Sequence, residues 1–323
     1  MLKLFKIKNK KISIKDHYSR RNKVLIKRRA GGFGDIVMQR MLIEDFSKTG
    51  LDIHYCCPHN YIKIMEGHPF LKELKELSDI KEEEYGIVYD ITTICAVTES
   101  IFGPKNTKHR SDIWANHCGV ELTNHETYLK SDQQDLITYK EKLKNLNTKN
   151  QKIVFISTKS TKNEFGEAKS LSDDQVVELV NEIKKLDYFI VTSNEEFQEV
   201  YSKLDVKQFV KLPVSEWIAL IDCCDYVVSI DTAAFHIAGA LKKPLLGIFS
   251  FTDGKIYGKY YNFILVQKHR DNGDWPCGPC FCYNICPKEK IKNRKPCIAE
   301  LSTNDMLLGF KNLIDGAQRI VNL

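Results

Sequence analysis

The stretch at residues 226–253, YVVSIDTAAFHIAGALKKPLLGIFSFTD, restricts the possible folds more than any other part of the chain. Tyr226–Ile230 has the length and β-branching of a buried strand, and Leu245–Phe249 has the same character. Between them, residues 232–241 are rich in alanine and stop before Pro244, as a helix would. A strand, a short helix and a second strand form a βαβ unit, which belongs to a parallel sheet.

The point where this first strand meets the helix is a candidate ligand site. Ligands bind such sheets beyond the carboxyl ends of the strands, and Asp231 stands at that end. The amides of Thr232, Ala233 and Ala234 open the helix, where N–H groups lack intrahelical partners and the macrodipole is positive. We therefore expect a phosphate at these amides and a hydroxyl group on Asp231. An aspartate that only caps the helix would fit the spacing equally well.

Strands and helices alternate through all 323 residues, a length that favours two ordinary cores. In the first half we predict strands at 23–29, 52–57 and 87–91, with mostly helix over 59–77. A polar stretch rich in Lys and Asn at 129–151 is the best candidate for a domain linker. The strands predicted in the second half are 153–157, 188–192, 209–212, 226–230, 245–249 and 263–266, with helices at 172–186 and 304–321. Strands that alternate with helices indicate an α/β protein with parallel, doubly wound sheets.

A glycine-rich turn, AGGFGD at residues 30–35, lies between the first predicted strand and a helix. Gly31, Gly32 and Gly34 allow a ligand to approach the backbone closely and direct Asp35 out of the turn. The dinucleotide fingerprint requires a glycine three residues past Gly34, which this chain lacks. An aspartate that serves as a helix N-cap would have the same spacing.

These two segments resemble those of glycosyltransferase family nine, the bacterial heptosyltransferases and their relatives. In the second half, the family has Asp-Thr/Ser-Gly, a His three residues later, an Ala-rich helix and a Gly-Pro-Thr-Asp-Pro turn. The matching positions here are Asp231, Thr232, His236, Thr252 and Asp253. The chain departs at Ala233, where the family usually has Gly, and around the turn. In the first half, the family's Gly-Asp carries the catalytic base, which maps onto Asp35.

The resemblance implies the GT-B fold, in which two Rossmann-like, doubly wound domains face a central cleft. The expected parts are a basic arm at 1–22, an acceptor domain at 23–140, a nucleotide-sugar domain at 150–302 and a C-terminal helix at 303–323. The implied reaction is an inverting, metal-independent transfer of a heptose or related sugar. The donor would be a nucleotide sugar, and the acceptor a hydroxyl of a lipopolysaccharide-core-like glycan.

The resemblance also implies roles for single residues on the donor side. Lys169 matches a family lysine that contacts phosphate, although Leu171 stands where an aromatic residue is common. A solvent-exposed lysine ahead of a capped helix is an equal alternative. His236 would face the phosphate rather than the core, and Thr252 and Asp253 would bind the ribose or the sugar of the donor.

Five of the eleven cysteines crowd together, and the five are Cys277, Cys280, Cys282, Cys286 and Cys297. In a chain without an export signal, a CxxC with further cysteines nearby indicates a structural zinc or iron–sulfur site. The spacing is not that of a standard zinc ribbon, so a metal and no metal are equally compatible with it. Catalysis is expected to need no cofactor, and no two aspartates have the Asp-x-Asp spacing of a metal-dependent transferase.

The net charge of +6 is unevenly distributed, since residues 1–30 hold twelve Lys or Arg against one acid, Asp16. This indicates an anionic partner, which could be a lipid surface, a phosphorylated glycan or nucleic acid. A solvated tail is the commoner role of such a run. With no apolar run near ~20 residues and lysines throughout the first eleven positions, we expect a cytoplasmic protein that associates peripherally with the inner membrane surface.

Two other functions fit the sequence. One is a glycosyltransferase that acts on hydroxylated bases of DNA, in which the basic arm would follow the phosphates. The other is a non-catalytic, metal- and nucleic-acid-binding protein built on the cysteine cluster.

Overall fold

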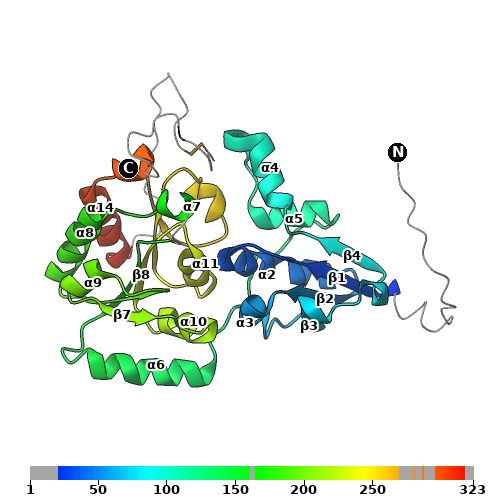
Figure 1. Ribbon diagram of the computed structural model, residues 1–323, viewed down its shortest axis with the longest axis horizontal. Coiled ribbons are helices and arrows are strands. Elements are labelled where there is room, and N and C mark those ends of the chain that lie inside the picture. The colour runs from blue at the N-terminus through cyan, green and yellow to red at the C-terminus, as the bar shows by residue number, and fades with distance from the viewer. Residues whose placement is uncertain (1–20, 161–163, 269–278, 281–285, 287–294, 317–323) are drawn as a thin grey trace.

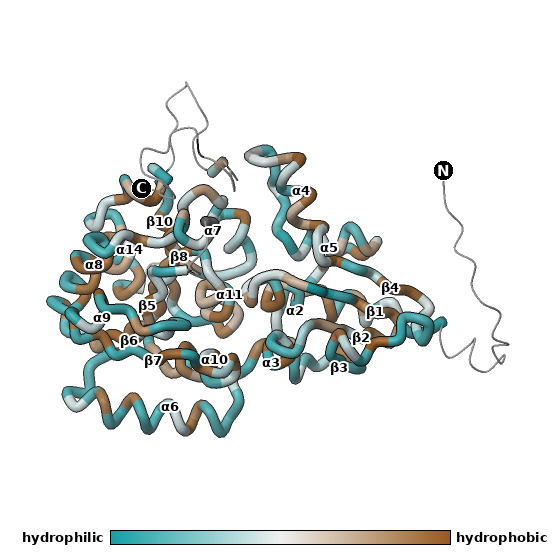
Figure 2. The backbone as a smooth tube through the Cα atoms, viewed as in Figure 1, coloured by the Kyte–Doolittle hydropathy of each residue, from teal (hydrophilic) through white to brown (hydrophobic). Residues whose placement is uncertain are grey.

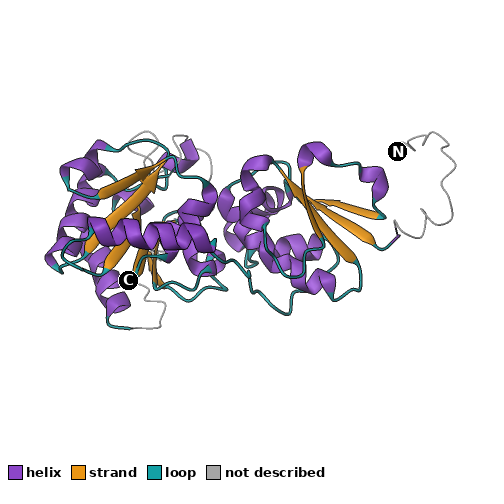
Figure 3. Cartoon of the chain, turned by 90° about the horizontal axis from the view of Figure 1, so that it is seen from below, coloured by secondary structure: helices purple, strands orange, loops and turns teal. Residues whose placement is uncertain are grey.

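The computed structural model describes residues 21–160, 164–268, 279–280, 286 and 295–316 (Figure 1). Its strands form two parallel sheets, one from each half of the chain, and helices flank both sheets (Figure 3). The N-terminal sheet has the order β3-β2-β1-β4, and the C-terminal sheet has the order β10-β9-β8-β5-β6-β7. This confirms the predicted α/β fold with two Rossmann-like units. Most of the predicted basic arm lies outside the described residues.

The N-terminal unit is built around β1, which pairs in parallel with β2 on one side and β4 on the other. Its strands are β1 (Lys23–Lys27), β2 (Asp52–Cys57), β3 (Glu73–Glu76) and β4 (Ile87–Asp90). Its helices are α2 (Phe33–Ser47), α3 (Ile62–Met65), α4 (Ile94–Phe102) and α5 (Arg110–His117). α2 is buried on most of its surface, because it packs against the second unit as well as its own.

The prediction of mostly helix over 59–77 is wrong. Helical structure stops at Met65, and the chain turns at Gly67, whose φ is 69°. Glu73–Glu76 then pairs in parallel with β2 as an edge strand. Its charged side chains suit a helix or an exposed edge equally well, so the pairing with β2 determines the outcome.

The C-terminal unit contains the predicted βαβ unit, with β8 and β9 buried along their whole lengths. Its strands are β5 (Ile153–Ser157), β6 (Phe189–Asn194), β7 (Lys207–Val210), β8 (Tyr226–Ile230), β9 (Leu245–Phe249) and β10 (Ile264–Gln267). Its helices are α7 (Glu164–Glu167), α8 (Asp173–Lys185), α9 (Glu199–Lys203), α10 (Val214–Asp222), α11 (Ala233–Ala240), α12 (Gly254–Tyr257), α13 (Pro296–Ala299) and α14 (Thr303–Ile314). Residues 317–323, the end of the predicted last helix, lie outside the described part of the chain.

The polar stretch expected to link the halves contains α6 (Gln133–Leu146), which lies along the C-terminal unit (Figure 1). Asp132 caps it by accepting from two backbone amides of the first turn. The helix buries Tyr139 and Leu143 against α10, and the Tyr139 hydroxyl donates to Glu216 at 2.6 Å. The Lys-rich stretch therefore contains an amphipathic helix, whose few apolar residues pack against the second unit. The residue limits given for the two domains stay predictions.

Among the described residues, no helix combines the length and the hydropathy required to span a bilayer.

Candidate active site

A cleft of about 1160 Å³ lies between the two units. One wall comes from α2, α4 and α5, and the other from segments at the carboxyl ends of β5, β6, β7, β8 and β9. Carboxyl ends of parallel strands from both sheets therefore meet at this cleft, as the sheet topology requires of a ligand site. The predicted site residues that line it are Gly32, Gly34, Asp35, Lys169, Asp231, Thr232, Ala233, His236 and Cys280.

Gly34 brings the two halves of the predicted site into contact. A Cβ atom added to it would lie 2.7 Å from Cδ2 of His236 and 3.4 Å from Cα of Ala233. The first turn of α2 therefore touches the first turn of α11, and a side chain would separate them. This contact places Asp35, the next residue, beside the proposed phosphate site.

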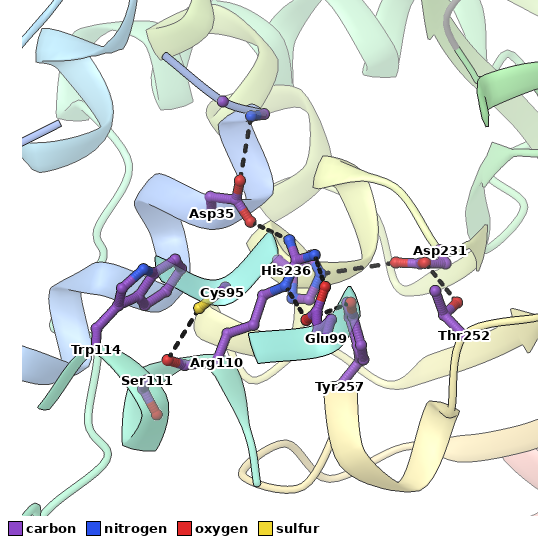
Figure 4. A network of polar contacts seen from close by, with 12 residues as sticks. Asp35, Cys95, Glu99, Arg110, Ser111, Trp114, Asp231, His236, Thr252 and Tyr257 are labelled. Carbon is purple, nitrogen blue, oxygen red and sulfur yellow. Dashed lines mark hydrogen bonds and ion pairs between the residues drawn. The ribbon is translucent and has the colours of Figure 1, made fainter. Parts of the chain in front are cut away.

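Asp35 is largely buried and accepts hydrogen bonds from two arginines, of which Arg110 is labelled in Figure 4. Arg28 Nη2 donates to Oδ2 at 2.7 Å, and Arg110 Nη1 donates to Oδ1 at 2.5 Å. Burial by itself raises the pKa of Asp35, but the charges of Arg110 and Arg28 outweigh it and hold the pKa below its ordinary value. The N-cap of α2 is Gly32, whose amide donates to Asp35 at 3.3 Å. Asp35 therefore supports the helix start and stays ionised in the cleft.

The second arginine links the base candidate to the opposite unit. Arg110 donates to both oxygens of Glu99, at 2.7 and 2.6 Å, and its guanidinium lies 4.9 Å from the centroid of the Tyr257 ring. Tyr257, at the end of α12, donates from its hydroxyl to Glu99 at 2.8 Å. Asp35, Arg110, Glu99 and Tyr257 thus form one buried network across the two units (Figure 4).

On the donor side, Thr232 is the N-cap of α11, and its side chain makes no capping hydrogen bond. The Thr232 hydroxyl instead lies 3.2 Å from the hydroxyl groups of Ser157 and Ser229. Since no side chain caps the amides that open α11, they can bind an anion. Asp231 is not the cap, so the capping alternative does not hold.

Asp231 accepts from Lys169 Nζ at 2.6 Å and from the Thr252 hydroxyl at 2.7 Å. Burial by itself raises the pKa of Asp231. The interactions with Lys169 and His236 lower the pKa by more than burial raises it, so it lies below its ordinary value. His236 Nε2 is 3.9 Å from Asp231 Oδ1, and burial lowers the pKa of His236 to about 4. The site therefore pairs an ionised aspartate with a lysine next to a neutral histidine. The exposed-lysine alternative for Lys169 does not hold, because its side chain is largely buried.

Four predicted site residues lie near the cleft without lining it. Thr252 is buried against Asp231, and Ala234 is buried within α11. Asp253 caps α12 by accepting from the amide of Lys255 at 2.8 Å. Gly31 has a φ of 138°, and an added Cβ would meet the Arg28 guanidinium, so its role is to make room for that arginine.

Two of the five clustered cysteines, Cys277 and Cys282, lie outside the described residues. Cys280 packs with Cys297 in a small apolar cluster, and Cys286 is buried. In the part of the chain that the structure describes, no group of three or more His, Cys, Asp or Glu is placed to hold a metal ion. The five-cysteine metal site stays a prediction.

Several residues in or beside the cleft were not identified from the sequence. Those that line it are Glu99, Arg110, Trp217 and Tyr257, and Arg28 lies behind them on Asp35. The helix macrodipole disfavours a cation at the first position of a helix, and Arg110 begins α5. This unfavourable placement could have identified Arg110 as a residue with a functional role. Arg28 directly follows β1 as observed, where site residues collect, but the predicted strand 23–29 included it and so hid this position. Glu99 and Tyr257 carried no such signal.

Comparisons with known proteins agree with this arrangement. The family model for glycosyltransferase family 9 (heptosyltransferase) matches residues 112–284. A family 9 glycosyltransferase structure from Veillonella parvula DSM 2008 covers 91% of this chain and 98% of its own, with a TM-score of 0.65 at 13% identity. The ADP-heptose LPS heptosyltransferase II of E. coli covers 92% of this chain and 100% of its own, with a TM-score of 0.60 at 10% identity.

A third similar structure is the dodecameric, iron-containing heptosyltransferase TibC in complex with ADP-D-β-D-heptose, a protein of enterotoxigenic E. coli H10407. It covers 92% of this chain and 78% of its own, with a TM-score of 0.66 at 14% identity. No curated protein matches the sequence. At these identities the solved structures establish a shared GT-B fold, while the family model spans more than half of the chain. The chain therefore belongs to glycosyltransferase family 9, the heptosyltransferase family, and is a glycosyltransferase.

Proposed function

We propose that this protein transfers a heptose or related sugar from a nucleotide-diphosphate donor to a hydroxyl of a lipopolysaccharide-core-like glycan, with inversion at the anomeric carbon. The observation that carries the proposal is that one cleft holds Asp35 from the first unit and Lys169 with the start of α11 from the second. ADP-heptose is the donor to test first, because the similar structure of TibC is a complex with ADP-D-β-D-heptose. That of another similar protein, the E. coli heptosyltransferase WaaC, holds ADP-2-deoxy-2-fluoro-heptose.

The donor's diphosphate would bind at the first turn of α11, where the uncapped amides and the macrodipole supply positive character. Lys169 adds a full charge beside them, held in place by Asp231. As the sugar–phosphate bond breaks, negative charge builds up on the leaving diphosphate, and these groups stabilise it. The proposed reaction needs no metal, because this charge comes from the chain itself.

Asp35 would accept the proton of the acceptor hydroxyl. The acceptor oxygen forms a bond to the anomeric carbon while the bond to the diphosphate breaks, and the proton passes to the Asp35 carboxylate. A carboxylate with a lowered pKa is a weak base. It suffices here if the proton moves late, since the hydroxyl becomes strongly acidic once its oxygen has bonded to carbon.

The test uses one substitution in each wall of the cleft, so that the roles of the two walls are measured separately. Asp35→Asn is expected to lower transfer by ~10²–10⁴-fold, the usual contribution of a general base, while ADP affinity measured by calorimetry stays near that of the wild type. Lys169→Ala is expected to weaken ADP binding and transfer together. The transfer rate should be the same with and without a chelator.

An Asp35→Asn variant that keeps more than about a hundredth of the wild-type rate would remove Asp35 from the role of base. A strict requirement for a divalent cation would contradict the metal-free mechanism. Family membership already argues against the non-catalytic alternative, since it makes the chain a glycosyltransferase.

A further inference from the structure

α4 (Ile94–Phe102) forms part of the cleft wall and presents different chemistry on each of its faces. Residues four apart lie on the same stripe of a helix. Cys95 and Glu99 form the buried stripe, on which Glu99 pairs with Arg110. Ala96 and Ser100 form the next stripe, which lines the cleft.

The third stripe of α4 faces solvent and is apolar. Val97 is 51% exposed and Ile101 is 69% exposed, while Phe102, at the helix end, is 54% exposed. We call these three residues the α4 ridge, and Figure 2 shows hydrophobic segments along α4. The other large exposed apolar residues of the described chain are scattered over several elements. Three such side chains within six residues indicate a surface that is covered in function.

The exposed charges next to the α4 ridge in the sequence are of one sign. Between residues 92 and 108 the only acid is Glu99, which is buried and paired. Lys105 and Lys108 follow the ridge, and both are exposed. Apolar side chains beside lysines match the boundary of a lipid bilayer, where the apolar groups enter the acyl region and the cations stay among anionic headgroups.

We infer that the α4 ridge docks on an anionic lipid membrane surface. A second copy of the chain fits this surface less well. A symmetric dimer through the ridge would bring Lys105 and Lys108 of both copies to one interface, and the ridge segment offers them no exposed acid, since Glu99 is buried. Anionic headgroups instead neutralise these lysines.

Docking would place the cleft beside the lipid headgroups, because the cleft stripe of α4 is next to the ridge. This part rests on the proposed function: an acceptor anchored in the membrane could then present its hydroxyl to Asp35. The membrane contact itself is independent of the reaction and can be measured without a donor.

The experiment compares three full-length proteins for binding to vesicles of phosphatidylcholine, with and without phosphatidylglycerol. The ridge variant combines Val97→Gln, Ile101→Gln and Phe102→Gln. The control variant combines Ile137→Gln, Leu146→Gln and Leu308→Gln, which removes three exposed apolar residues from α6 and α14. Because residues 1–22 are also basic, binding is measured at low and at high salt, where charge attraction is screened.

We expect the wild type and the control to bind vesicles that contain phosphatidylglycerol, and the ridge variant to bind at least about tenfold more weakly, with the difference persisting at high salt. Wild type that does not bind, or a ridge variant that binds like the wild type, would overturn the inference. Self-association that the ridge variant loses, without any vesicle binding, would also overturn it. Transfer to a water-soluble acceptor should be equal in all three proteins, so its absence would count against the proposed function and not against the ridge.

Discussion

At the scale of single residues, the cleft is organised by two buried carboxylates and two buried guanidinium groups. Arg28 donates to Asp35 and to the carbonyls of Ile91 and Thr92, so its position is set by the backbone that follows β4. Arg110 is shared between Asp35 and Glu99. Removal of one member of such a group leaves an uncompensated buried charge, which is the costly case for a buried ion pair.

Arg110→Gln is therefore expected to change the pH dependence of transfer. In the wild type the pKa of Asp35 lies below its ordinary value, so the active, ionised form persists throughout the neutral and mildly acidic range. Without Arg110, burial is less well compensated and the pKa of Asp35 rises. kcat/KM should then fall at a higher pH in the variant than in the wild type. Arg29→Gln is the matched control, since Arg29 is exposed and pairs with Asp90. Identical pH profiles for all three proteins would show that Arg110 does not set the ionisation of Asp35.

At the scale of elements, the first turns of α2 and α11 carry the two halves of the proposed chemistry and touch each other. The space for this contact comes from Gly34, where any side chain would meet the ring of His236 and the backbone of Ala233. His236 is itself buried, so it has little room to move aside.

We predict that Gly34→Ala destabilises the protein by about 1–3 kcal/mol, the usual cost of overpacking, although alanine is the better helix former. ADP affinity should fall with it, because the start of α11 is displaced. Chemical unfolding and calorimetry measure the two effects. Gly32→Ser is the control, since a Cβ at Gly32 has nothing within 4 Å and serine is a good N-cap. Equal unfolding free energies for wild type and Gly34→Ala would mean that the two helices can separate at no cost.

At the scale of the whole molecule, both units contain buried neutral histidines. Burial lowers the pKa of His68 and of His109 to about 3 and that of His236 to about 4. His68 uses both ring nitrogens, because Nδ1 accepts from the amide of Phe70 and Nε2 donates to the carbonyl of Arg40. In the unfolded chain each histidine takes up a proton near pH 6.5. The folded chain resists that proton until a lower pH.

The free energy of unfolding should therefore fall as the pH drops below about 6.5, since the unfolded state then binds more protons than the folded state. Each such histidine contributes a slope of up to about 1.4 kcal/mol per pH unit until its folded pKa is reached. Urea unfolding at a series of pH values measures the slope, and His68→Gln should make it shallower by one histidine's share. His59→Gln is the control, because His59 is exposed. A slope that His68→Gln leaves unchanged would show that His68 is not the neutral group described here.

Much of the site follows from local sequence. Buried strands are recognised by their β-branched runs, and polar residues directly after such strands must reach the same edge of a parallel sheet. That reasoning placed Asp231 at the cleft, while the glycine-rich turn placed Asp35 there. The Ala-rich helix located the amides that we propose bind the phosphate. Lys169 and His236 came from the family resemblance, and the structure places both at the cleft.

Only the tertiary structure determined the contacts between residues that lie far apart in the chain. Asp35 and Arg110 are separated by 75 positions, and Glu99 and Tyr257 by 158. No local pattern encodes such pairs, because they depend on how the two sheets and their helices come together. The same holds for β3, whose charged residues become a strand only by pairing with β2. The sequence alone indicated that Asp35 and Asp231 reach the cleft, while the packing of the two units determined which residues these carboxylates touch.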